Sequence, residues 1–147
     1  MLEILDTAGS EQFSSLQDLY IRNGQGFVLV YSIASLQSLL DLESVYQQIL
    51  HFKTNGSFQR SRAKKGSQPT WTQPPPPIVL VGNKADLGPH DREVPKSEAD
   101  ALARRWGCCA FIEASAKTGD AVVEVFREVV LRVSLADVCC VTTYFTD

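Results

Sequence analysis

Hydrophobic and polar positions along the chain form two kinds of pattern. Short apolar runs indicate strands that are buried on both faces, as in a parallel sheet, and they predict strands near 2–6, 27–32, 78–82 and 110–113. Longer segments with apolar residues three or four apart predict amphipathic helices near 13–22, 36–52, 96–106 and 120–134. Strands that alternate with helices predict an α/β fold with a partial, doubly wound and mostly parallel sheet.

Cap and turn residues support these helix limits. Ser35 is a suitable N-cap, because its hydroxyl can accept a hydrogen bond from a free N–H of the first helical turn. Ser97 is expected to begin the next helix with an acidic first turn, and Gly107 to end it. Gly119 and Asp120 are expected to begin the last helix.

One segment follows neither pattern. Residues 53–77 lose the periodicity, end in four prolines, and carry five basic residues and no acidic one. The segment is longer than a usual connection between a helix and a strand, so we expect an insertion outside the core. We therefore predict one domain over 1–147, an insertion at 53–77 and a divergent tail at 135–147.

Composition excludes several classes of protein. The net charge of −3 gives no general affinity for nucleic acid. The four cysteines form two vicinal pairs without metal-ligand spacing, which predicts free thiols in a reducing, cytoplasmic compartment. No apolar stretch reaches the roughly 20 residues that span a bilayer. His51 and His90 are isolated, so neither is read as a catalytic base or a metal ligand.

Polar residues follow three of the predicted strands, where ligands bind in open α/β sheets. The motifs are Asp-x-x-Gly at 6–9, Asn-Lys-x-Asp at 83–86 and Ser-Ala-Lys at 115–117. The carboxylate of Asp86 could accept two hydrogen bonds from a planar donor edge such as that of guanine. The alternatives are structural: Asp6 as a strand-end cap, Asp86 as a cap in an ordinary strand-to-helix turn, and a simple turn at 115–117.

In this order the three motifs resemble those of the Ras superfamily of small GTPases, over about 1–52 and 77–133. Residues 18–26, Asp-Leu-Tyr-Ile-Arg-Asn-Gly-Gln-Gly, look most like the Rap subfamily. The resemblance implies a monomeric switch in signal transduction that binds GTP or GDP with Mg²⁺ and hydrolyses GTP. It also implies GTPase-activating proteins, exchange factors and effectors as partners. An unrelated nucleotide-binding α/β module would need a glycine-rich fingerprint, which is absent.

The resemblance also assigns roles to residues. Asp6 would hold Mg²⁺ through water, and the backbone N–H of Gly9 would meet the γ-phosphate. Ser10 stands where Ras-like proteins usually have a glutamine that orients the attacking water, which implies slow intrinsic hydrolysis. Rap-like proteins also depart from glutamine here. Six residues would contact the base or shape its loops: Asn83, Lys84, Asp86, Ser115, Ala116 and Lys117.

The chain departs from the family pattern in its phosphate site. Nothing in the 147 residues matches Gly-x-x-x-x-Gly-Lys-Ser/Thr, and family members carry a strand–loop–helix–strand unit before the position of Met1. We therefore expect impaired nucleotide binding and hydrolysis, and unpaired edges on the strands near 2–6 and 27–32. By resemblance, the segment after Gly9 and the predicted helix near 13–22 are switch II. The alternative is a non-catalytic fragment or alternative product that presents this switch II surface to partners. Tyr144 occupies the place of a prenylated cysteine, so no prenyl anchor is expected.

Overall fold

The fold is built on a parallel sheet. The computed structural model describes residues 2–7, 14–55, 75–133 and 139–146. Its five-stranded sheet has the order β1-β5-β2-β3-β4, and every pair of neighbouring strands is parallel. The strands are β1 (Leu2–Thr7), β2 (Gly26–Ser32), β3 (Ile78–Asn83), β4 (Ala110–Glu113) and β5 (Cys139–Phe145).

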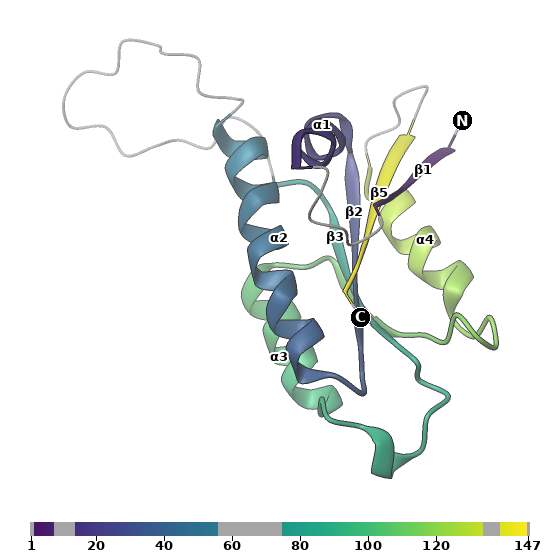
Figure 1. Ribbon diagram of the computed structural model, residues 1–147. Helices are drawn as coiled ribbons and strands as arrows, with labels where there is room; N and C mark the ends of the chain where they lie inside the picture. Colours follow the sequence, from purple (N-terminus) through teal and green to yellow (C-terminus); the bar gives the residue numbers. More distant parts are fainter. Residues whose placement is uncertain (1, 8–13, 56–74, 134–138, 147) are drawn as a thin grey trace.

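Helices cover both faces of this sheet (Figure 1). One face carries α1 (Ser14–Asn23), α2 (Leu36–Asn55) and α3 (Lys96–Trp106), and the other carries α4 (Val122–Val130). A 3₁₀ turn, η2 (Pro89–Asp91), lies between β3 and α3. The predicted doubly wound α/β fold is confirmed.

Alternation along β2 explains how the two layers form. Phe27 and Leu29 enter the core beneath α1, α2 and α3, whereas Val28 and Val30 enter the core beneath α4. All seven residues of β2 are buried, as expected for a central parallel strand. In the first core, the ring of Tyr46 stacks on the ring of Trp106, with 4.6 Å between centroids. The Tyr46 hydroxyl also donates to the backbone carbonyl of Trp106 (2.9 Å).

The position of β5 corrects one expectation. β5 lies between β1 and β2, so Val141 is the register partner of both Ile4 and Gly26. The prediction of unpaired edges on the strands near 2–6 and 27–32 is wrong for the edges that face each other, because β5 pairs with both. Residues 141–145, Val-Thr-Thr-Tyr-Phe, are β-branched or aromatic and suit a strand.

Most helix limits agree with the predictions, and Ser35 is confirmed as a cap, since its Oγ accepts from the N–H of Ser38 (3.2 Å). Gly107 ends α3 in the left-handed conformation. The predicted bounds of α3, 96–106, are confirmed, but the N-cap is Pro95 and not Ser97, and Pro95 offers no side-chain bond. The last helix is shorter than expected and begins after Ala121, not at Gly119 and Asp120.

The predicted insertion lies mostly outside the described residues. α2 continues to Asn55, so the first residues of 53–77 are helical. At the other end, the carbonyl of Pro77 accepts from the N–H of Phe27 (2.9 Å), which places the chain at the start of β3 beside β2. Residues 56–74 are not described.

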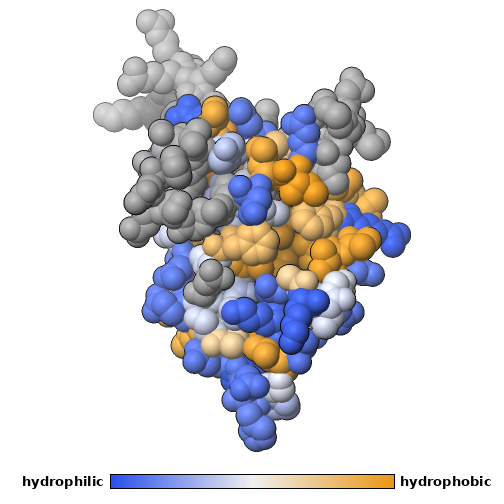
Figure 2. All heavy atoms as spheres, turned by 45° about the vertical axis from the view of Figure 1, so that its right-hand side comes forward, coloured by the Kyte–Doolittle hydropathy of each residue, from blue (hydrophilic) through white to orange (hydrophobic). Residues whose placement is uncertain are grey.

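The α4 side of the molecule exposes apolar surface. Figure 2 brings this side forward and shows hydrophobic side chains gathered across its middle. Ile4 is 49% exposed and Phe145 42%, and both lie on the face of the sheet that carries α4. Among the described residues, no helix is both long and apolar enough to cross a membrane.

Candidate functional site

The site is built from two loops at the carboxyl ends of neighbouring strands. One begins at Asn83, the last residue of β3, and contains Lys84 and Asp86, and the other follows β4 and contains 114–118. Backbone bonds join them: the N–H of Ala114 donates to Gly82 (2.9 Å), and the N–H of Ala85 donates to Ala114 (3.0 Å). The sheet order therefore places the second and third sequence motifs side by side.

Side chains then fix the two loops to each other. The hydroxyl of Ser115 donates to Oδ1 of Asp86 at 2.6 Å, and the backbone N–H of Ala116 donates to Oδ1 of Asn83 at 3.0 Å. The buried Ser115 hydroxyl also accepts from the N–H of Thr118 (3.2 Å). Four of the six predicted base-site residues thus contact the opposite loop through hydrogen bonds: Asn83, Asp86, Ser115 and Ala116.

The surroundings of Asp86 keep its carboxylate ionised. The hydrogen bond from Ser115 lowers the pKa of Asp86 from its ordinary value of 3.8. A backbone hydrogen bond and the charge of Lys117 lower this pKa further, while partial burial opposes them. Nζ of Lys117 lies 3.9 Å from Oδ2 of Asp86, and the lysine side chain is largely exposed. At neutral pH Asp86 therefore offers only acceptor sites.

The turn after β3 holds Lys84 in an unusual conformation. Its φ of 69° lies in the left-handed region, which residues other than glycine seldom adopt. The carbonyl of Lys84 accepts from the N–H of Leu87 (3.0 Å), and Ala85 binds the neighbouring loop. The backbone strain at Lys84 is therefore balanced by bonds that fix the loop around Asp86.

These contacts leave a recognisable pattern of donors and acceptors. The backbone N–H of Ala116 can only donate, so the oxygen of the Asn83 amide faces it and the Nδ2 group can donate elsewhere. Asp86 keeps Oδ2 and the remaining lone pairs of Oδ1 as acceptors. An acceptor pair beside an amide donor suits a planar ring whose edge carries two N–H donors next to acceptor atoms, as guanine does.

The other predicted site residues are only partly described. Asp6 lies near the end of β1, is exposed, and accepts a long hydrogen bond from the hydroxyl of Thr143 (3.4 Å). Gly9 and Ser10 lie outside the described residues. Asp6 fits the role of a single carboxylate at a Mg²⁺ that is otherwise held by water and phosphate oxygens. In the described part of the chain, no group of three His, Cys, Asp or Glu side chains could hold a metal on its own.

A comparison with models of protein families gives the family of the chain as a whole. A model described as "Ras: Ras family" matches residues 1–135. The chain belongs to the Ras family. Ras family domains in general are switches that bind guanine nucleotides with Mg²⁺, hydrolyse GTP and meet regulators and effectors. β5 begins at Cys139, after the matched residues end.

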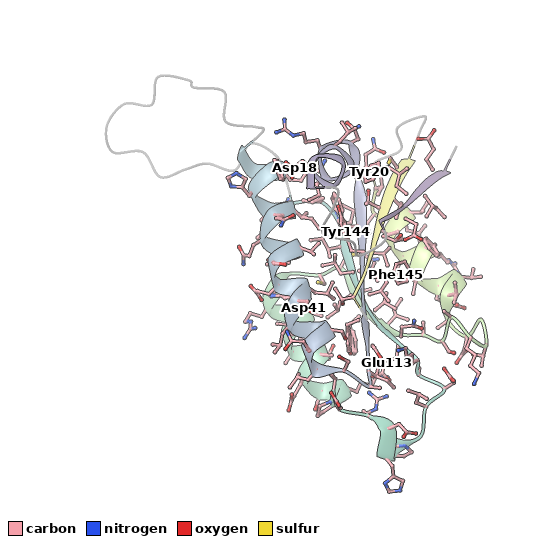
Figure 3. The ribbon with its side chains drawn as sticks, viewed as in Figure 1. Asp18, Tyr20, Asp41, Glu113, Tyr144 and Phe145 are labelled. Atoms are coloured by element: carbon pink, nitrogen blue, oxygen red, sulfur yellow. The ribbon has the colours of Figure 1, made fainter. Side chains whose placement is uncertain are left out.

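Sequence analysis missed two features beside these loops. One is a mostly apolar pocket of about 90 Å³ beside Asn83 and Ala116, which is also lined by Thr143 and Phe145 of β5. The other is Glu113, labelled in Figure 3 at the end of β4, which forms an ion pair near the two loops. Neither follows a local sequence pattern, because each depends on segments that are distant along the chain.

Proposed function

We propose that this Ras family chain is a Rap-like domain that recognises the guanine base but is impaired in binding and hydrolysing GTP. Base recognition rests on Asp86 and Asn83 with the loop at 115–117. The observation that carries the proposal is the pair of short bonds, from Ser115 to Asp86 and from Ala116 to Asn83, which hold both base-facing side chains in place. The Rap-like assignment rests on the amino-acid sequence of residues 18–26 and on the serine at position 10.

The position of β5 supports impaired phosphate binding. By resemblance, the slot between β1 and β2 belongs to the strand that leads into the phosphate-binding loop, and here β5 occupies it. After β5, the N–H and the hydroxyl of Thr146 both donate to the carbonyl of Val30 (3.0 and 3.1 Å). That hydroxyl also contacts the carbonyl of Ser38 (2.7 Å). The N–H of Thr146 is thus engaged with β2 and does not contribute to a cradle for phosphate.

A second candidate function, presentation of the switch II surface to a protein partner, is favoured by the packing of α1. The backbone carbonyl of Arg22 accepts from Nζ of Lys53 (2.8 Å). The guanidinium of Arg22 lies over the ring of Phe52, with Cζ 5.1 Å from the ring centroid. These contacts fix the end of α1 on α2, whereas Leu19 remains 48% exposed between Asp18 and Tyr20, labelled in Figure 3. Such a surface would be presented whether or not nucleotide is bound.

The experiment is a titration of the purified chain with fluorescent GTP and fluorescent ATP in the presence of Mg²⁺, together with phosphate release. We expect binding weaker than micromolar, at least about tenfold tighter for GTP than for ATP, and phosphate release at background. Equal affinity for GTP and ATP would refute base recognition. Micromolar or tighter binding with turnover above background would refute the impairment.

A further inference from the structure

An ion pair ties the far end of the loop after β3 to the last residue of β4. Nη1 of Arg92 lies 2.7 Å from Oε1 of Glu113, and Nη2 lies 3.1 Å from Oε2, so the guanidinium binds the carboxylate with both arms. The two side chains are only 25% and 13% exposed. A bidentate, partly desolvated pair of this kind constrains geometry far more than a surface ion pair does.

The backbone around Arg92 is itself anchored. The N–H groups of Glu93 and Val94 both donate to the carbonyl of Ile33 (2.9 and 3.0 Å). The carboxylate of Glu93 accepts from the N–H of Leu36 at the start of α2 (2.9 Å). Nη1 of Arg92 also donates to the carbonyl of Val94 (3.1 Å). Arg92 therefore reaches Glu113 from a fixed base beside the end of β2.

This anchor closes the base-facing loop at both ends. At the start of the loop, the N–H of Ala85 donates to the carbonyl of Ala114. At the end of the loop, the guanidinium of Arg92 binds the carboxylate of Glu113, the residue directly before Ala114. Asp86 lies between these two ties, opposite Ser115. Rotation of the loop away from the strand end would break one tie or the other.

We propose that Arg92 is a positioning residue for guanine recognition, which holds Asp86 against Ser115 by gripping Glu113. The inference rests on the proposed function, since it assigns Asp86 to the base. Loss of the guanidinium would leave the Glu113 carboxylate facing only the exposed Lys96, at 4.0 Å, among the cations that the structure describes. An unmatched and largely buried carboxylate is unfavourable, so the strand end and its loops would shift to hydrate it.

The first test is hydrogen exchange of backbone amides, measured by NMR without ligand. Arg92→Met keeps an apolar side chain of similar length but removes the guanidinium. Arg92→Lys keeps the positive charge but not the planar guanidinium that binds both carboxylate oxygens. The matched control is Arg104→Met, which breaks the exposed pair of Arg104 with Asp100 on α3 (2.6 Å). In Arg92→Met we expect the amides of Ala116 and Thr118 to exchange about tenfold faster or more relative to those of β2, with Arg92→Lys intermediate and the control unchanged.

Uniform acceleration across the sheet, or none, would overturn the inference. If Arg92→Met does not fold, Glu113→Gln takes its place, because it keeps the size of the side chain and one acceptor oxygen.

The second test is the ratio of GTP to ATP affinity in the same variants. We expect this ratio to fall in Arg92→Met and to be unchanged in the Arg104→Met control. If amide exchange in the loops becomes faster in Arg92→Met but the ratio of GTP to ATP affinity does not fall, the role of Arg92 in guanine recognition is refuted. If the unaltered chain shows no guanine preference, the proposed function fails, and the exchange experiment still decides whether Arg92 positions the loops.

Discussion

At the scale of single residues, Asp86 depends on its neighbours for both orientation and charge. Ser115 donates to one carboxylate oxygen, and Lys117 lies near the other. A carboxylate held in this way can accept two N–H groups from one ring edge, whereas a mobile side chain would lose entropy on binding. Recognition of the base is therefore expected to be sensitive to small changes at Asp86 and Ser115.

Replacing Asp86 by Asn is expected to change base preference. An amide can pair one donor and one acceptor, so it suits xanthine, whose edge has an acceptor where guanine has an amine. Titration with guanine and xanthine nucleotides should show weaker binding of the former and stronger binding of the latter. Asp91→Asn, on the exposed turn η2, serves as the control and should leave the preference unchanged. An unaltered preference in Asp86→Asn would refute the assignment.

The pKa of Asp86 predicts how the site responds to acid. Its folded pKa lies below the ordinary value of 3.8, mainly because of Ser115, so folding stabilises the ionised form. This contribution is complete above the ordinary pKa and is lost as pH falls through the folded pKa. NMR signals of the Ala116 and Thr118 amides should stay constant between about pH 5 and 8. Ser115→Ala should raise the pKa of Asp86, and an unchanged titration would contradict this.

At the scale of helices and strands, the sequence predicted what local pattern determines. The strands β1 to β4 and the helices follow apolar runs and helical periodicity, and the contact between 83–86 and 115–116 follows from strand ends that share one edge. β5 was not predicted, because Cys139–Phe145 becomes a central strand only through pairing with β1 and β2, more than a hundred residues away along the chain. The bond between Arg92 and Glu113 depends in the same way on residues brought together by folding.

The central position of β5 predicts a strong effect at Val141. Val141 is 0% exposed and lies in the apolar core beneath α4. Val141→Asp would bury a carboxylate in this apolar core, so it should lower the free energy of unfolding by about 3 kcal/mol or more. The matched control is Val123→Asp on α4, where the side chain is 74% exposed and the cost should stay within about 0.5 kcal/mol. Urea unfolding measures both. Equal effects would contradict the placement of β5 in the sheet.

At the scale of the whole molecule, we propose that the base-facing half of the nucleotide site is formed and the phosphate-facing half is impaired. The base-facing half is assembled at the ends of β3 and β4 by bonds within and between loops. At the slot between β1 and β2, β5 completes the sheet and leads to Thr146, whose N–H binds β2. The described fold thus joins a continuous parallel sheet to a site that we propose is specific for the base and weak for phosphate.

Phosphate contacts normally provide much of the affinity of nucleotide-binding domains, through backbone N–H groups, a lysine and a hydroxyl on Mg²⁺. Because β5 occupies the slot between β1 and β2 and the N–H of Thr146 is engaged with β2, our proposal expects added phosphates to contribute little. The most direct measurement is therefore the affinity of the chain for guanosine, GMP, GDP and GTP with Mg²⁺, followed by NMR at the Ala116 amide. We predict weak affinities that agree within about threefold across the series. Affinity that rises with each phosphate, so that GTP binds about a hundredfold or more tightly than guanosine, would contradict the account.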